Sequence, residues 1–324
     1  MATPMIPPAA APAFLAVHGW GDARIEPLAG DASFRRYFRV VAPGRSAVLM
    51  DAPPPHEDPR PFLAVARHLA GLGFAPPGVL GEDLATGLVL LEDFGDARMR
   101  EVVDADRAAE TAVYERAIDL LLALRRCPPA PWLRPYGMDE YQRELALFID
   151  WYAPAAVGPV DGAGYVAAWA DALAPLADDR SVTVLRDYHA ENLMLLADGR
   201  LGLLDFQDAL AGHPVYDLVS LLQDARRDVS PALEAAMLDR YAAGAPLDRA
   251  AYAVLGAQRN AKILGIFTRL WKRDGKPRYL AYQPRVWRYL ERDLADPALA
   301  PVRAWFDANI PAAARAGVGE AMSA

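Results

Sequence analysis

The chain has 324 residues, 53% of them hydrophobic and 23% charged, a composition typical of a soluble globular protein. Its net charge of −8 argues against a general nucleic-acid-binding surface, which needs a basic field. No stretch reaches the roughly 20 uninterrupted apolar residues of a membrane span. Because the apolar start has no positive segment and Cys127 is the single cysteine, neither a signal peptide nor an internal disulfide is expected, and we expect a cytoplasmic protein.

The first 94 residues predict a mainly antiparallel β region. Residues 25–51 indicate a strand, a turn at 30–33, a second strand over 34–41 and a third over 47–51. Pro59 and Pro61 suit the first turn of a helix that runs to about Ala70. A further hairpin is predicted from strands at 79–84 and 88–93.

After Gly95 the pattern becomes mostly helical. Asp104 is expected to cap a helix that runs to Arg126. Further helices are expected over 139–152, 163–177, 215–227, 231–243, 248–271, 278–293 and 298–308. The sequence therefore predicts an α+β protein, with an N-lobe over 1–94 and a helical C-lobe over 95–324.

One predicted hairpin within the second region carries polar side chains. Apolar runs at 193–196 and 201–204 flank Asp198-Gly199, which is typical of a two-residue turn. Such a turn would set Asn192 opposite Asp205, at roughly 5 Å between Cβ atoms. An amide oxygen and a carboxylate suit Mg²⁺, which keeps few protein ligands and also binds substrate phosphates. Asp187, five residues before Asn192, can reach the same place as a proton acceptor.

This pattern resembles a known family. Asp187-x-x-x-x-Asn192 followed by Asp205 resembles the catalytic loop and metal-binding aspartate of the two-lobed protein-kinase-like fold. Asp187-Tyr188-His189 and Tyr216-Asp217-Leu218 resemble the aminoglycoside phosphotransferase branch of that fold. Within this branch the chain is similar to the bacterial anomeric sugar kinases, which phosphorylate N-acetylmuramate and N-acetylglucosamine at C1 in peptidoglycan recycling. The segments that carry this similarity are GDASFRRYFRV (30–40), VLMDAPPP (48–55), LRDYHAENLM (185–194), LDFQDALAGHPVYDLVSLLQD (204–224) and QRNAKILGIF (258–267).

The resemblance implies ATP and Mg²⁺ as cofactors, bound in a cleft between the lobes beside a hinge near residue 94. It implies Asp187 as the catalytic base, Asn192 and Asp205 as metal ligands, and Asp217 as a brace for the catalytic loop. Backbone groups of Leu91–Phe94 would bind adenine. The residues that it implies for nucleotide binding are Ser33, Phe34, Arg35, Arg36, Glu92, Asp93 and Phe94. The candidates for sugar binding are His189, Glu191, Gln207, Asp208, Arg259, Asn260 and Lys262, and His189 could equally be a structural hydrogen-bonding partner.

The chain departs from the fold at large in one respect. The lysine expected on the strand after the phosphate loop is absent, with Met50 near its position, and the helix over 62–69 has no acid to pair with it. We expect Arg35, Arg36 or Arg39 to supply the missing cation, although these arginines could instead be solvated charges at the edge of a sheet.

Two alternatives to an amino-sugar kinase stay open from the sequence. The missing lysine is compatible with a nucleotide-binding protein that does not catalyse. The acceptor could also be a cation such as an aminoglycoside or choline, although the basic residues over 258–273 argue against that. The partner is expected to be a small amino sugar, with no nucleic acid, no membrane insertion and no obligate protein partner.

Overall fold

The computed structural model describes residues 5–28 and 35–318, and the chain forms two compact units. The first comprises Met1–Val102 together with Glu191–Asp208, and the second comprises Val103–Ala190 together with Ala209–Ala324. The segment that carries the predicted hairpin therefore belongs to the first unit, although it lies 89 residues beyond Val102 in the sequence. No helix in the described ranges is long and apolar enough to cross a membrane.

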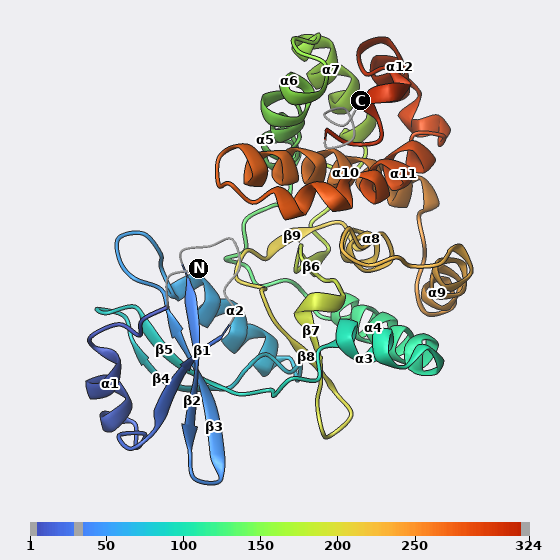
Figure 1. Ribbon diagram of the computed structural model, residues 1–324. Coiled ribbons are helices and arrows are strands. Elements are labelled where there is room, and N and C mark those ends of the chain that lie inside the picture. The colour runs from blue at the N-terminus through green and yellow to red at the C-terminus, as the bar shows by residue number, and fades with distance from the viewer. Residues whose placement is uncertain (1–4, 29–34, 319–324) are drawn as a thin grey trace. The chain divides into compact units, whose positions relative to one another are not determined.

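The first unit is built on a five-stranded antiparallel sheet in the order β1-β2-β3-β5-β4 (Figure 1). Side chains alternate between the two faces of a strand. On one face Phe38 and Val40 pack with Leu49, and Phe14 of α1 covers them. The residues on the other face include Met50, which lies opposite Tyr37 in the β2–β3 register. The strands and first helix are β1 (Arg24–Pro27), β2 (Arg36–Ala42), β3 (Arg45–Asp51), β4 (Val79–Asp83), β5 (Leu88–Glu92) and α1 (Ala11–Val17).

The helix predicted after Pro59 is present as α2 (Arg60–Gly71). Proline suits the first turn because its missing N–H would have no partner there. The ring of Phe62 stacks on Phe206, with 5.0 Å between ring centroids, so α2 packs against the chain that follows the hairpin.

The hairpin formed by β7 (Leu193–Leu195) and β8 (Leu201–Leu203) differs by one residue from the predicted register. Leu195 pairs with Leu201, and the N–H of Leu204 donates to the carbonyl of Asn192 at 2.9 Å. The turn has three residues rather than two. Gly199 has a positive φ of +85°, but Asp198 does not, and a two-residue type I′ turn would need a positive φ at both positions. The prediction that Asn192 lies opposite Asp205 is therefore wrong, since Leu204 takes that place.

The second unit is mainly helical and is organised around its longest helix, α10 (Figure 1). At Gly265 this helix approaches the C-terminal end of α5 so closely that a Cβ atom would meet the backbone carbonyl carbon of Leu147 at 2.3 Å. A short pair of strands, β6 (Val182–Val184) and β9 (Leu210–Gly212), completes the unit. Its helices are α4 (Glu110–Arg125), α5 (Met138–Leu147), α6 (Ala153–Ala156), α7 (Gly162–Leu173), α8 (Tyr216–Leu222), α9 (Pro231–Gly244), α10 (Arg249–Lys272), α11 (Gln283–Asp293) and α12 (Ala300–Asn309).

The predicted cap at Asp104 is wrong. Asp104 lies inside α3 (Met99–Ala105), and a 3₁₀ turn separates that helix from α4. Asp106 caps this turn by accepting a hydrogen bond from the N–H of Ala108 at 3.0 Å. Asp104 instead accepts a hydrogen bond from Nε of Arg227 at 2.9 Å. A distant arginine thus determines the role of this carboxylate, which local capping patterns cannot reveal.

Candidate active site

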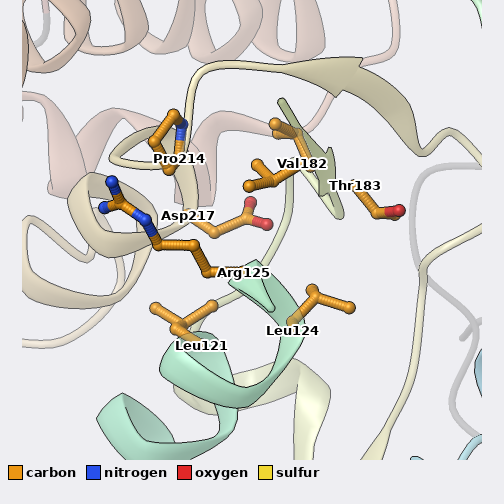
Figure 2. Close-up of a pocket in the computed structure, with 8 residues that line it drawn as sticks. Leu121, Leu124, Arg125, Val182, Thr183, Pro214 and Asp217 are labelled. Atoms are coloured by element: carbon orange, nitrogen blue, oxygen red, sulfur yellow. The ribbon is translucent and has the colours of Figure 1, made fainter. Parts of the chain in front are cut away.

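Asp217 at the start of α8 holds the backbone of the predicted catalytic loop. Its carboxylate accepts hydrogen bonds from the N–H groups of Leu185 at 2.6 Å and Arg186 at 2.9 Å. Figure 2 shows this carboxylate among Leu121, Val182 and other apolar groups. Burial raises the pKa of Asp217 to about 7, against the lowering effect of the two backbone hydrogen bonds. The predicted bracing role of Asp217 is confirmed by these two contacts.

Arg186 has a positive φ of 71°, which is uncommon for a residue other than glycine. Its guanidinium binds Glu144 of α5, a carboxylate with a side chain only 2% exposed. The loop residue next to the predicted base is therefore held both through its backbone and through its side chain.

Glu144 is bound by four side chains that come from three segments of the second unit. Besides Arg186 it accepts hydrogen bonds from Tyr136 at 2.6 Å, Lys262 at 2.8 Å and Gln258 at 3.0 Å. Burial would raise the pKa of this carboxyl, but Lys262 and Arg186 outweigh it and lower the pKa to about 2. Glu144 is therefore an anion that neutralises two buried cations under the catalytic loop.

Asp187, the predicted base, is 44% exposed at its side chain, and Nη2 of Arg259 lies 3.8 Å from its Oδ1. Partial burial would raise the pKa of Asp187, but Lys262 and Arg259, with smaller contributions from His189 and Arg186, lower it to about 2. The carboxylate is ionised at neutral pH, so it can orient a hydroxyl group and accept its proton when the hydroxyl oxygen reacts.

Asn192 and Asp205 lie in the first unit at the open end of the hairpin. Asn192 directly precedes β7, and Asp205 follows two residues after β8 with φ +57°. The carboxylate of Asp205 accepts a hydrogen bond from Gln207 at 2.9 Å. No group of three or more histidine, cysteine, aspartate and glutamate side chains that could hold a metal ion occurs in the described ranges. One carboxylate and one amide are a donor set that fits Mg²⁺ when phosphate oxygens complete its coordination.

Among the predicted nucleotide contacts, Ser33 and Phe34 lie outside the described residues. Glu92 ends β5 and accepts a hydrogen bond from the N–H of Gly78 at 3.1 Å. Asp93 forms an ion pair with Arg39, 2.9 Å between Oδ2 and Nε. The ring of Phe94 lies against Gly202 of β8, where a larger side chain would collide with it.

The predicted sugar contacts of the first unit all follow or precede the hairpin. Glu191 binds Arg100, and the amide of Gln207 donates to Asp208 at 3.3 Å as well as to Asp205. These polar groups lie close in sequence to the two candidate metal ligands. Their contact with a sugar stays a prediction.

The predicted sugar contacts of the second unit differ in their surroundings. Asn260 donates to Gln223 at 2.7 Å inside the core, and Lys262 is held by Glu144. His189 contacts Arg226, with 3.0 Å between Nε2 and Nη1, and burial lowers the pKa of its imidazole to about 4. Arg259 forms an ion pair with the carboxylate of the predicted base.

The family model for the phosphotransferase enzyme family matches residues 24–255, which includes the catalytic loop and both candidate metal ligands. The chain belongs to the phosphotransferase enzyme family. The N-acetylmuramate/N-acetylglucosamine kinase of Caulobacter vibrioides is 41% identical to it, over 95% of this chain and 98% of that protein. The protein of the same name from Pseudomonas aeruginosa is also 41% identical, over 88% of each chain. The resemblance to the bacterial amino-sugar kinases and the prediction of a phosphotransferase are confirmed.

Solved structures show the same fold. A choline/ethanolamine kinase family protein from Mesorhizobium loti aligns with a TM-score of 0.62 at 19% identity, over 91% of this phosphotransferase and 98% of that chain. Choline kinase LicA from Streptococcus pneumoniae aligns with a TM-score of 0.61 at 14% identity, over 86% and 93% of the two chains. Together with the antiparallel sheet and the helical second unit, these alignments confirm the predicted α+β, protein-kinase-like fold.

The sequence did not single out two acids of this phosphotransferase. Glu144 lies four residues after Glu140 on α5, a spacing that indicates a solvated face, yet both side chains are buried. Glu57 precedes α2 and forms an ion pair with Arg35, 3.7 Å between Oε2 and Nε. No local signal distinguishes either acid, because the partners of Glu144 come from residues 136, 186, 258 and 262.

Proposed function

We propose that this phosphotransferase transfers the terminal phosphate of ATP, with Mg²⁺, to the anomeric C1 hydroxyl of N-acetylmuramate and N-acetylglucosamine in peptidoglycan recycling. The observation that supports this most strongly is the 41% identity, over nearly the whole length of both chains, to a kinase named for these two sugars. We place the enzyme in the cytoplasm, where ATP is available, and propose no nucleic acid and no obligate protein partner.

Asn192 and Asp205 are proposed to hold Mg²⁺ at the open end of the hairpin. The bound metal would neutralise negative charge on the phosphate groups during transfer. Backbone groups of Leu91–Phe94 are proposed to bind adenine. Solved members of this fold have been crystallised with AMP or with ADP, so a nucleotide is the expected ligand of the first unit.

Asp187 is proposed to act on the acceptor. The C1 oxygen forms a bond to the terminal phosphorus, the bond between that phosphorus and ADP breaks, and the hydroxyl proton passes to the carboxylate of Asp187. With a pKa of about 2, Asp187 is a weak base that is always ionised at neutral pH. It suits an anomeric hydroxyl, which is more acidic than an ordinary sugar alcohol and becomes more so as its oxygen reacts.

A cationic acceptor such as choline or an aminoglycoside is less well supported. Arg259 and Lys262 both act on Asp187 from within the same unit, and they would repel a positive charge brought to its carboxylate. The solved choline and aminoglycoside kinases share only 13–21% identity with this chain, so they indicate its fold and not its acceptor.

A panel of acceptors tests the proposal. Release of ADP from ATP and Mg²⁺ would be measured with N-acetylmuramate, N-acetylglucosamine, glucose, choline and an aminoglycoside, with Asp187→Asn as the inactive control. We expect release that depends on either amino sugar. Release with choline or the aminoglycoside alone, or with no acceptor in the panel, would overturn the assignment.

A further inference from the structure

The structure separates the three arginines that could replace the missing lysine of β3. Arg36 lies on the α1 face of the sheet, because its guanidinium is 5.8 Å from the ring of Phe38, a core residue of that face. There its Nε donates to Asp51 at 2.9 Å and its Nη1 donates to the carbonyl of Ile6 at 3.0 Å. Met50 points to the opposite face, so Arg36 is not in a position to replace a lysine there.

Arg39 shares the face of Met50 but is already bound by acidic groups. Its Nη2 donates to Asp96 at 2.8 Å, and its Nε lies 2.9 Å from Asp93. It is paired with Val48, two residues along β3 from Met50, and it lies beside the chain that follows β5. Two carboxylates therefore already bind this guanidinium.

Arg35 precedes β2 by one residue and is two residues from Tyr37, the cross-strand neighbour of Met50. Its Nε lies 3.7 Å from Oε2 of Glu57, and the two side chains are only 12% and 22% exposed. Burial raises the pKa of the Tyr37 phenol, the cation of Arg35 lowers it, and the carboxylates of Asp205 and Glu57 raise it. The stacking of Phe206 on Phe62 also brings Asp205, the residue before Phe206, to the start of α2, which Glu57 precedes by three residues. Arg35, Glu57 and the candidate metal ligand Asp205 are therefore gathered in one place within the first unit.

We propose that Arg35, held by Glu57, binds the nucleotide phosphates in place of the lysine–glutamate pair. This inference rests on the proposed function, because it needs a nucleotide whose metal is bound at Asp205. A guanidinium is always charged and presents five N–H donors in a planar fork, so one edge can face a carboxylate while the other binds phosphate oxygens. A partly buried arginine beside an acid and a candidate metal ligand has the charge and position for this role.

Calorimetric titration with a non-hydrolysable ATP analogue and Mg²⁺ tests the proposal without catalysis. We expect Arg35→Ala to weaken binding by about 10- to 100-fold, the loss expected from charge-assisted hydrogen bonds. Arg35→Lys should recover part of the affinity, because it keeps the charge. AMP, which has one phosphate, should lose less affinity than the triphosphate analogue, whereas a general loss of folding would affect both equally.

Two further variants make the test specific. Glu57→Gln should weaken binding less than Arg35→Ala, and it should have no added effect in the Arg35→Ala background, since it acts through that arginine. Arg67→Ala on α2, with a side chain 61% exposed, is the matched control and should bind like the wild type.

Wild-type affinity for the analogue in Arg35→Ala would overturn the inference, as would an equal loss for AMP and the analogue. If the Arg35→Ala protein does not fold, the same comparison is made with Arg35→Lys and Glu57→Gln. Unchanged affinity for the analogue in both variants rejects the role of Arg35. Failure of the proposed function can be distinguished from failure of the inference about Arg35. Absence of nucleotide binding by the wild-type protein would overturn both proposals, whereas absence of sugar phosphorylation with normal nucleotide binding would leave the role of Arg35 standing.

Discussion

Replacing Glu144 with glutamine should destabilise the second unit by an amount that follows from its surroundings. The substitution keeps the size of the side chain but removes the negative charge between Arg186 and Lys262, whose side chains are 13% and 9% exposed. The pKa of Glu144 is about 2 against an ordinary value of 4.5. This difference corresponds to about 3 kcal/mol of unfolding free energy, close to the roughly 3–5 kcal/mol typically lost when one partner of a buried ion pair is removed.

The same shift predicts how stability depends on pH. Because the pKa of Glu144 is lower in the folded chain than in the unfolded one, its contribution is fully present above about pH 4.5. It is lost as the pH falls toward 2, where the folded carboxylate takes up a proton. Glu144→Gln should lack this part of the acid dependence. The difference in unfolding free energy between variant and wild type should therefore shrink on acidification.

Urea unfolding followed by tryptophan fluorescence measures this effect. The second unit contains all but one of the seven tryptophans, so the signal reports mainly on it. Glu144→Gln combined with Lys262→Met should be more stable than Glu144→Gln alone, because one uncompensated cation is gone. Glu115→Gln on α4, with a side chain 41% exposed, is the control and should change stability by no more than about 0.5 kcal/mol. A similarly small change in Glu144→Gln at pH 7, or an acid dependence equal to that of the wild type, would refute the reasoning.

Four further substitutions test individual roles. Asp187→Asn should lower turnover by about 10²–10⁴-fold with nearly unchanged nucleotide affinity in calorimetry, and near-normal turnover at saturating sugar would contradict its role as base. Asp205→Ala should weaken binding of the Mg²⁺-nucleotide as well as turnover, and Asn192→Ala should do so less severely; unchanged affinity in Asp205→Ala would rule out the metal role. Arg259→Ala should raise KM for N-acetylmuramate more than for N-acetylglucosamine, because only N-acetylmuramate carries a lactyl carboxylate. Nη1 of Arg259 has no hydrogen-bond partner among the described residues and can bind that carboxylate. Equal changes in KM for the two sugars would exclude that contact.

Local patterns predicted the sheet and most helices because their information lies within a few residues. Alternation places Phe38 and Val40 in the core, and Pro59 marks the start of α2. The hairpin shows the limit of such patterns. Asp198-Gly199 fits both a two-residue turn and the end of a three-residue loop, and the choice between them moves the partner of Asn192 by one residue.

The environment of the predicted base depends on contacts that the sequence does not display. Lys262 and Asn260, which the sequence offers as candidate sugar contacts, belong to a polar stretch of α10, and the structure buries both. Their partners, which include Glu144 and Asp293, come from α5 and α11, and a buried charge becomes acceptable only when such distant groups meet it. The residue types of the catalytic loop are therefore predictable from sequence, whereas the groups that set their pKa values are not.

The position of the transferred phosphate is the most direct test of the proposed function. N-acetylglucosamine and N-acetylmuramate labelled with ¹³C at C1 would each be incubated with the enzyme, ATP and Mg²⁺, and the products examined by ³¹P and ¹³C NMR. We expect the new phosphorus signal to couple to the labelled C1 and its proton, with no product from Asp187→Asn. Phosphate on C6, or no transfer to either sugar, would contradict an anomeric kinase.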